Sequence, residues 1–174
     1  MADMTDKLEY IHQYKTPMGI MTGISEGTAI TGLSFEMPEK LSLLGKQTEQ
    51  KAELPVFQEL DIWIRTYFAG EDPGMQLPIK PEGTPFQQSV WQIVAEVPYG
   101  TLITYGEIAR RLARQRGIPR MSAQAVGGAM ARNPISLLIP CHRVIAADGS
   151  LGGYGGCLER KRELLRCEGI ISIT

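Results

Sequence analysis

Apolar and polar positions alternate along the first part of the chain, which is the pattern of strands that are buried on one face. Three short runs carry this alternation, at residues 8–12, 19–25 and 28–35. Glu26-Gly27 supplies turn residues between the second and third runs. The pattern therefore predicts a small antiparallel sheet. Residues 38–50 are too weakly patterned to assign.

Helical spacing replaces the alternation from Pro55 onward. Apolar residues then recur every three or four positions, and Gly70 stands where such a helix would end. The positions that share one face are Phe57, Leu60, Ile64, Tyr67 and Phe68. One helix packed on a small sheet makes an α+β unit.

A stretch rich in proline and glycine follows the helix. Residues 71–83 contain three prolines and two glycines, a composition typical of a linker. The charge also changes sign there: residues 1–83 hold 13 Asp and Glu against 7 Lys and Arg, whereas residues 84–174 hold 6 against 11. We therefore expect two domains, 1–80 and 81–174.

The second part of the chain is predicted to be mostly helical. Thr84-Pro85-Phe86-Gln87 has the residues of a capping box and begins a helix that ends before Pro98. Thr104 to Glu107 repeats the cap pattern and predicts a short helix through about Leu112, and Ser122 caps another through about Arg132. The last helix runs over residues 158–168.

The two short helices with the turn between them fit a helix-turn-helix, and the first of them is rich in arginine. Gly127-Gly128 lies inside the second helix and lowers its stability. Either another helix packs closely there, or a partner approaches the backbone.

Residues 133–144, Asn-Pro-Ile-Ser-Leu-Leu-Ile-Pro-Cys-His-Arg-Val, carry the candidate chemistry. The apolar run predicts a buried strand or extended segment that Pro140 ends, which delivers Cys141 to an edge. A thiol reacts as the thiolate, and a nearby histidine or positive charge favours that form. In an extended segment Cys141 and His142 would point in opposite directions, so proton transfer between them would pass through a water.

Composition bounds the setting in which this chemistry takes place. Hydrophobic residues make up 43% and charged residues 21%, as in a globular protein, and the polar N-terminus does not resemble a signal peptide. Cys141, Cys157 and Cys167 are an odd number without Cys-x-x-Cys spacing, which argues against disulfides and zinc and favours a reducing, cytoplasmic location. Seven arginines and one acid between 101 and 143 suit phosphate backbone, although such a block can also be a solvated face.

Asn133-Pro134, Pro140-Cys141-His142-Arg143-Val144 and Gly153-Tyr154-Gly155-Gly156 resemble the O6-alkylguanine-DNA alkyltransferases, also called methylated-DNA–protein-cysteine methyltransferases. The likeness extends from about Gly83 to Gly169. It implies a ribonuclease H-like N-terminal domain, a helix-turn-helix in the C-terminal domain, and a monomer that acts on double-stranded DNA without a cofactor or metal. The implied reaction is irreversible transfer of the alkyl group of O6-alkylguanine, with O4-methylthymine as a further candidate substrate, to Cys141, once per protein.

The resemblance also suggests roles for single residues. Glu168 would orient His142, Tyr105 would press on the target phosphate and protonate the leaving guanine, and Asn133 would brace the turn beside the active-site segment. The implied substrate pocket consists of Tyr154, Gly155, Val144, Ser150 and Met130. The implied DNA contacts are Arg120, Ser122, Ala123, Gln124, Gly127 and Arg132.

One position departs from the family pattern. Many members have an arginine near the start of the recognition helix that fills the gap left by the flipped base, and this chain has Gln124 there. Glutamine can hydrogen-bond the orphaned base but lacks the charge and stacking plane of arginine, so weaker DNA binding is expected unless Arg120 substitutes.

Cys157 stands where a further glycine is common, and we assign it no role.

Three other functions compete with repair by transfer. A lesion sensor would flip alkylguanine without reacting, but related sensors lack the cysteine that stands here at Cys141. A transcription regulator would need an effector module, and a cysteine hydrolase would need an oxyanion hole, and neither is evident in the sequence.

Overall fold

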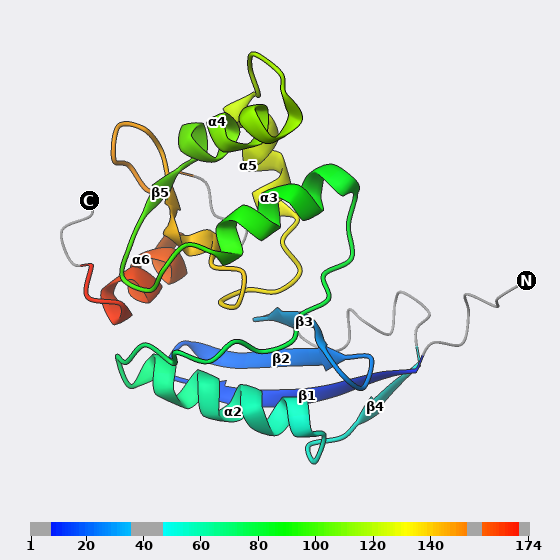
Figure 1. Ribbon diagram of the computed structural model, residues 1–174. Helices are drawn as coiled ribbons and strands as arrows, with labels where there is room; N and C mark the ends of the chain where they lie inside the picture. Colours follow the sequence, from blue (N-terminus) through cyan, green and yellow to red (C-terminus); the bar gives the residue numbers. More distant parts are fainter. Residues whose placement is uncertain (1–7, 36–46, 153–157, 171–174) are drawn as a thin grey trace, which may run out of the picture. The chain divides into compact units, whose positions relative to one another are not determined.

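Backbone contacts divide the chain into two units, Met1–Pro81 and Glu82–Thr174. The computed structural model describes residues 8–35, 47–152 and 158–170. The fold is mixed α+β; among the described residues, the four-stranded sheet and helix α2 (Pro55–Phe68) belong to the first unit and the other helices to the second (Figure 1).

A four-stranded sheet forms the first unit, in the order β3-β2-β1-β4. Its strands are β1 (Glu9–Thr16), β2 (Gly19–Ser25), β3 (Ile30–Ser34) and β4 (Thr48–Gln50). β1, β2 and β3 pair antiparallel, as the alternation predicts, but β4 pairs parallel to β1. All three residues of β4 are exposed, so this edge strand has no apolar pattern by which the sequence could reveal it.

The helix α2 (Pro55–Phe68) lies along one face of this sheet (Figure 1). Its proline occupies the first turn, where a missing backbone N–H costs nothing. The buried side chains are Val56, Phe57, Leu60, Trp63, Ile64 and Tyr67. Tyr14 of β1 donates a hydrogen bond from its hydroxyl to the Phe57 carbonyl over 2.9 Å, which joins sheet and helix across their apolar interface.

The second unit contains α3 (Pro85–Ala95), α4 (Tyr105–Arg116), α5 (Ala123–Ala131) and α6 (Leu158–Cys167). A two-stranded parallel sheet joins β5 (Ile103–Thr104) to β6 (Val144–Ile145). The helices begin where their capping residues predict: Thr84 and Gln87 form a complete capping box, and Thr104 and Ser122 each accept a hydrogen bond from the first turn of their helix.

α4 is a turn longer than the sequence predicted. It continues past Leu112 because the next residues, Ala113-Arg114-Gln115-Arg116, all favour helix. Gly117 then ends it with φ +63, a left-handed conformation that glycine adopts without steric cost. The Trp91 indole N–H donates to the Ala129 carbonyl over 2.9 Å and fastens α3 to α5.

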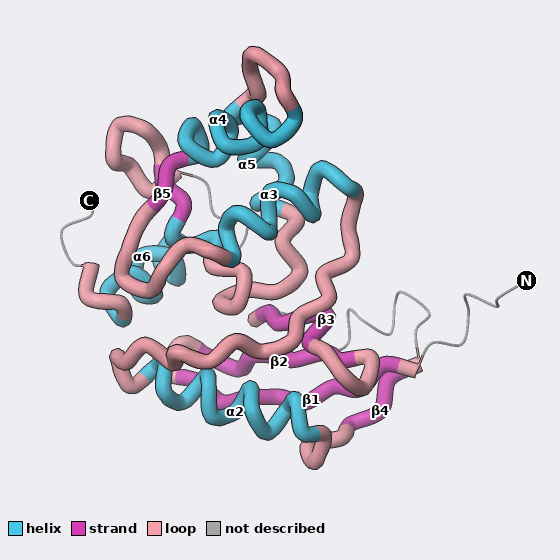
Figure 2. The backbone as a smooth tube through the Cα atoms, viewed as in Figure 1, coloured by secondary structure: helices cyan, strands magenta, loops and turns pink. Residues whose placement is uncertain are grey.

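The apolar run before Cys141 does not form the predicted strand. Residues 134–140 are buried in part but follow irregular turns, and Figure 2 shows loop where the chain leaves α5. Leu137 has φ +69, a strained conformation for a leucine. Asn133 closes the turn, because its amide donates to the Ile139 carbonyl and its side-chain oxygen accepts from the Ile135 N–H. These side-chain bonds take the place of a strand ladder.

Two glycines of this unit differ in the room around the position of a Cβ atom, so substituting each by alanine tests the packing. A Cβ at Gly83 would lie 2.5 Å from Trp91 Cη2, and the buried indole cannot move away. Gly83→Ala should therefore lower the free energy of unfolding by about 1–3 kcal/mol, measured by urea denaturation. Gly128→Ala is the control, because no described atom lies within 4 Å of that Cβ and alanine favours the helix. Equal effects of the two substitutions would contradict the packing described here.

Candidate active site

Cys141, His142 and Arg143 form a single turn of 3₁₀ helix, labelled η1 (Cys141–Arg143), directly before β6. The expectation of an extended segment is therefore wrong here. Successive side chains of a 3₁₀ turn point about 120° apart, so the three residues face three directions. Cys141 lines a pocket, His142 is wholly buried, and Arg143 reaches to the Val97 carbonyl over 2.7 Å.

The carboxylate of Glu168, just past the end of α6, accepts hydrogen bonds from two residues of this turn and from the backbone of a third residue. It accepts hydrogen bonds from His142 Nε2, from Arg143 Nε over 2.7 Å and from the Gly100 backbone N–H over 2.9 Å. The three side chains are all buried. Burial alone would raise the pKa of Glu168, but the hydrogen bonds and charges of His142 and Arg143 outweigh it and hold that pKa at about 2.

This arrangement sets the protonation of His142. Burial lowers the pKa of the imidazole, and it outweighs the opposing effect of Glu168. A neutral imidazole has one N–H, and an ionised carboxylate can only accept, so the proton lies on Nε2 and faces Glu168. Nδ1 then carries the lone pair that can take up a proton.

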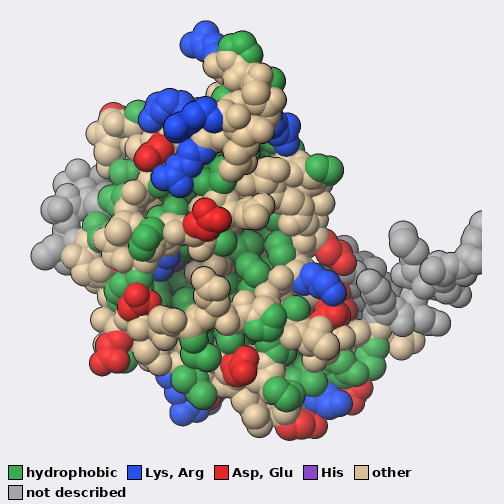
Figure 3. Space-filling view, in the orientation of Figure 1, with side chains coloured by type: hydrophobic (Ala, Val, Ile, Leu, Met, Phe, Trp, Pro, Cys, Tyr) green, Lys and Arg blue, Asp and Glu red, His purple; other side chains and the backbone are tan. Residues whose placement is uncertain are grey.

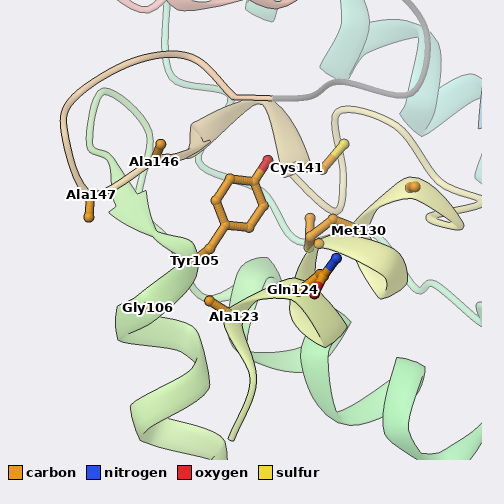
Figure 4. Close-up of a pocket in the computed structure, with 10 residues that line it drawn as sticks. Tyr105, Gly106, Ala123, Gln124, Met130, Cys141, Ala146 and Ala147 are labelled. Carbon is orange, nitrogen blue, oxygen red and sulfur yellow. The ribbon is translucent and has the colours of Figure 1, made fainter.

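The pocket next to Cys141 has a volume of about 730 Å³ (Figure 4). Small residues make up most of its lining, and Tyr105, Gln124 and Met130 are its larger members; the others are Gly106, Ala123, Gly127, Ala131, Ala146 and Ala147. Tyr105 projects into the pocket from the start of α4, with its hydroxyl on the side of Cys141. Burial and the nearby charge of Cys141 both raise the pKa of Tyr105, so the phenol keeps its proton at neutral pH.

The surface over α4 is cationic, and Lys and Arg side chains gather there in Figure 3. The exposed arginines of α4 and of the turn after it are Arg110, Arg111, Arg114, Arg116 and Arg120. Within the described ranges, no group of three or more His, Cys, Asp and Glu side chains is arranged to hold a metal ion. None of the helices in the described part of the chain has both the length and the apolar character needed to cross a bilayer.

Residues 85–170 match the family model of the 6-O-methylguanine DNA methyltransferase DNA-binding domain. A methylated-DNA–protein-cysteine methyltransferase from Methanosarcina acetivorans is 48% identical over 162 residues, which cover 92% of this chain and 98% of the relative. The corresponding relative from Haemophilus influenzae is 42% identical, with 92% of this chain and 87% of the relative covered. The chain belongs to the methylated-DNA–protein-cysteine methyltransferase family.

Solved structures of methyltransferases agree with this assignment. Mycobacterium tuberculosis O6-methylguanine methyltransferase superposes with a TM-score of 0.76 at 35% identity, and covers 95% of this chain and 94% of its own. The M. tuberculosis OGT in complex with DNA gives a TM-score of 0.74 at 37% identity, with 92% of each chain covered.

Several residues that the methyltransferase resemblance singled out come together in the structure. Cys141, Tyr105, Ala123, Gln124, Gly127 and Met130 line the pocket. His142 and Glu168 pair behind it, and Asn133 holds the turn that precedes Cys141. Arg120, Ser122 and Arg132 are exposed and do not belong to the pocket lining.

Two expected pocket residues lie elsewhere. Val144 is fully buried in β6, and Ser150 is exposed and donates its hydroxyl hydrogen bond to Asp148 over 2.7 Å. Neither residue lines the pocket as described. Val144 is buried because β6 enters the core directly after η1. Tyr154 and Gly155 fall outside the described residues.

Sequence reasoning missed Lys161, a fully buried lysine of α6. Its ammonium donates to the carbonyls of Val144 and Leu151. The helical spacing of the sequence could have indicated this residue. The buried stripe of α6 consists of positions at helical intervals, and it has a charged residue at each end: Lys161, Leu164, Leu165 and Glu168.

The low pKa of Glu168 makes stability depend on acid pH. The pKa of Glu168 is about 2 in the folded protein and about 4.3 in the unfolded chain, so the unfolded chain binds a proton first as pH falls. Glu168 therefore contributes about 3 kcal/mol to the free energy of unfolding above a pH of about 4.3, and this contribution is lost as pH falls toward 2. Glu168→Gln should remove this contribution and flatten the acid limb, measured by denaturation at several pH values. Glu163→Gln is the control, because Glu163 is an exposed partner of Arg166 on the same helix. An unchanged acid limb in Glu168→Gln would contradict the assignment.

Proposed function

We propose that this protein repairs DNA by moving the alkyl group of O6-alkylguanine onto Cys141, irreversibly and once per molecule. The observation that carries the proposal is the position of Cys141, which lines a pocket while the buried His142–Glu168 pair lies behind it. The names of the relatives in the family describe the same transfer to a protein cysteine.

His142 is the base that makes the thiol reactive. Its Nε2–H is held by Glu168, and its lowered pKa keeps it neutral at physiological pH, so Nδ1 accepts the Cys141 proton through a bridging water. Glu168 then stabilises the imidazolium that forms, as the carboxylate of a catalytic triad does. Asn133 and Arg143 hold the turn in place and do not take part in the chemistry.

The transfer exchanges one bond for another. The Cys141 thiolate attacks the alkyl carbon, a C–S bond forms, the C–O6 bond breaks, and its electron pair passes to the guanine. Tyr105 keeps its proton at neutral pH because its pKa is raised, and it donates that proton to the leaving guanine ring. The thioether product has no hydrolytic route back to the thiol, so each protein reacts once.

DNA would be bound by the C-terminal domain expected from the sequence, residues 81–174, with α4 and α5 as a helix-turn-helix. The exposed arginines of α4 suit phosphate, and Arg120, Ser122, Ala123, Gln124, Gly127 and Arg132 are the proposed contacts on and around α5. A Cβ at Gly127 or Gly128 would meet no described atom within 4 Å, so packing of another described helix does not account for these glycines. Close approach of DNA does, and the target base would be everted into the pocket.

The N-terminal domain expected from the sequence, residues 1–80, would be ribonuclease H-like. Its strand order β3-β2-β1-β4, with three antiparallel strands and β4 parallel to β1, supports that assignment.

Gln124 lines the pocket from the first turn of α5, where the family often has arginine. Gln124→Arg adds a cation and a planar group that can stack in the gap that the flipped base leaves in the duplex. The affinity for duplex DNA at moderate salt should therefore rise by about tenfold. Fluorescence anisotropy with a labelled duplex would measure it. Gln58→Arg on α2 is the control for added charge, because Gln58 is exposed in the other unit. Equal affinity of Gln124→Arg and the unaltered protein would refute this role.

Mass spectrometry tests the transfer itself. Incubation with a duplex that contains O6-methylguanine should add one methyl group to the peptide that contains Cys141, with one event per protein. Cys141→Ala should abolish the gain, and Cys167→Ala should not, since Cys167 does not line the pocket. Tight lesion binding without any gain in mass would show a sensor instead of a transferase.

A further inference from the structure

Four charged or imidazole side chains are buried within the described ranges, and all of them surround the nucleophile turn: His142, Arg143, Lys161 and Glu168. Glu168 pairs with His142 and with Arg143, whereas Lys161 bonds backbone carbonyls. Lys161 has 0% exposure. Burial of an ammonium group away from water is unfavourable unless its hydrogen bonds and nearby charges compensate for the lost hydration. A leucine at this position of the α6 stripe would not carry that cost.

The ammonium of Lys161 joins two segments of the chain next to the reaction site. It donates to the Val144 carbonyl, directly after η1, and to the Leu151 carbonyl, directly before Gly152. Gly152 has φ +69 and lies against Tyr105, since a Cβ there would be 3.4 Å from the tyrosine hydroxyl. Lys161 thus connects the segment that holds the nucleophile to the backbone that supports the proton donor.

Lys161 also faces the titratable groups of the site. Its Nζ lies 5.9 Å from the centre of the Tyr105 ring, and its positive charge acts on His142. Burial lowers the pKa of Lys161 to about 8, while the negative charge of Cys141 acts in the opposite direction. The lysine therefore remains largely protonated at neutral pH, with the thiolate as an opposite charge in a weakly polar environment.

The geometry of α6 explains how one helix can place charged groups next to both Cys141 and His142. Lys161 and Glu168 are seven residues apart, which places them on the same face and about 10 Å apart along the axis. Glu168 holds His142, and Lys161 presents its charge on the side of Cys141. One helix face therefore supplies the anion for the base and the cation for the nucleophile.

We propose that Lys161 is a positioning residue for alkyl transfer, which clamps the nucleophile segment to the backbone beneath Tyr105 and provides the positive charge that the Cys141 thiolate faces. The proposal rests on the proposed function, because it assigns the group that favours the reactive form of the same thiol. It predicts that loss of the charge affects thiol reactivity even when no DNA is present.

The test compares Lys161→Met with the unaltered full-length protein. Carboxamidomethylation of the Cys141 peptide by iodoacetamide is followed by mass across pH, and methyl transfer from an O6-methylguanine duplex is measured in single-turnover experiments. Removal of the charge should move the midpoint of Cys141 reactivity to higher pH and slow both reactions at pH 7 by about tenfold or more. Thermal unfolding establishes that the variant is folded.

Arg166→Met is the matched control, since Arg166 is a cation on the exposed face of α6 and pairs with Glu163. It should leave the pH midpoint and both rates unchanged. Lys161→Arg retains the charge and should keep the midpoint of the unaltered protein, although the larger guanidinium will slow methyl transfer. If Lys161→Met does not fold, a midpoint in Lys161→Arg that departs from that of the unaltered protein would overturn the proposal.

Unaltered rates and midpoint in folded Lys161→Met would overturn the proposal. So would a midpoint shift in Lys161→Arg equal to that in Lys161→Met, because charge would then have no part in the effect. These outcomes differ from failure of the repair function, which would appear as no methyl gain in the unaltered protein while its iodoacetamide reaction continued.

Discussion

The buried carboxylate of Glu168 is the interaction on which the second unit depends. It receives an imidazole, a guanidinium and a backbone N–H from segments that are far apart in sequence. Arg143 in turn bonds the Val97 carbonyl at the end of α3, so the helix end, the nucleophile turn and the loop before β5 are fixed through one anion. Loss of that anion would leave a buried cation without its partner, which is more costly than the intact pair.

Structural support and catalytic preparation are the same set of bonds in this site. A carboxylate that holds Arg143 for stability also fixes the tautomer of His142, because it can only accept hydrogen bonds. The imidazole is neutral because it is buried, and it is buried because α6 covers η1. Burial thus keeps the imidazole neutral, while Glu168 sets which of its nitrogens carries the proton.

Much of the helical framework could be predicted from the sequence, because caps and apolar stripes are local signals. Thr84, Thr104 and Ser122 each begin a helix as their residue types predict. The run before Cys141 was assigned wrongly, because its burial comes from turns closed by Asn133, and apolar content alone does not separate a buried turn from a buried strand. β4 escaped prediction because an exposed edge strand has no apolar face. Within the site, Cys141 could be found from its motif. The signal for Lys161 is weaker, because only its helical spacing with Leu164, Leu165 and Glu168 indicates that the side chain is on the buried face of a basic helix.

The positions of the cations divide binding from reaction. The arginines of α4 are exposed, so salt would screen the attraction for phosphate that the proposed function assigns to them. Arg143 and Lys161 are buried, where screening is weak and each charge acts on the groups in direct contact with it or close by. Small residues of α5 lie in the pocket lining near Cys141, so DNA can come close without displacing a bulky side chain. Under the proposed function, the exposed arginines would hold the DNA backbone whatever its sequence, and only a base that has entered the pocket would react.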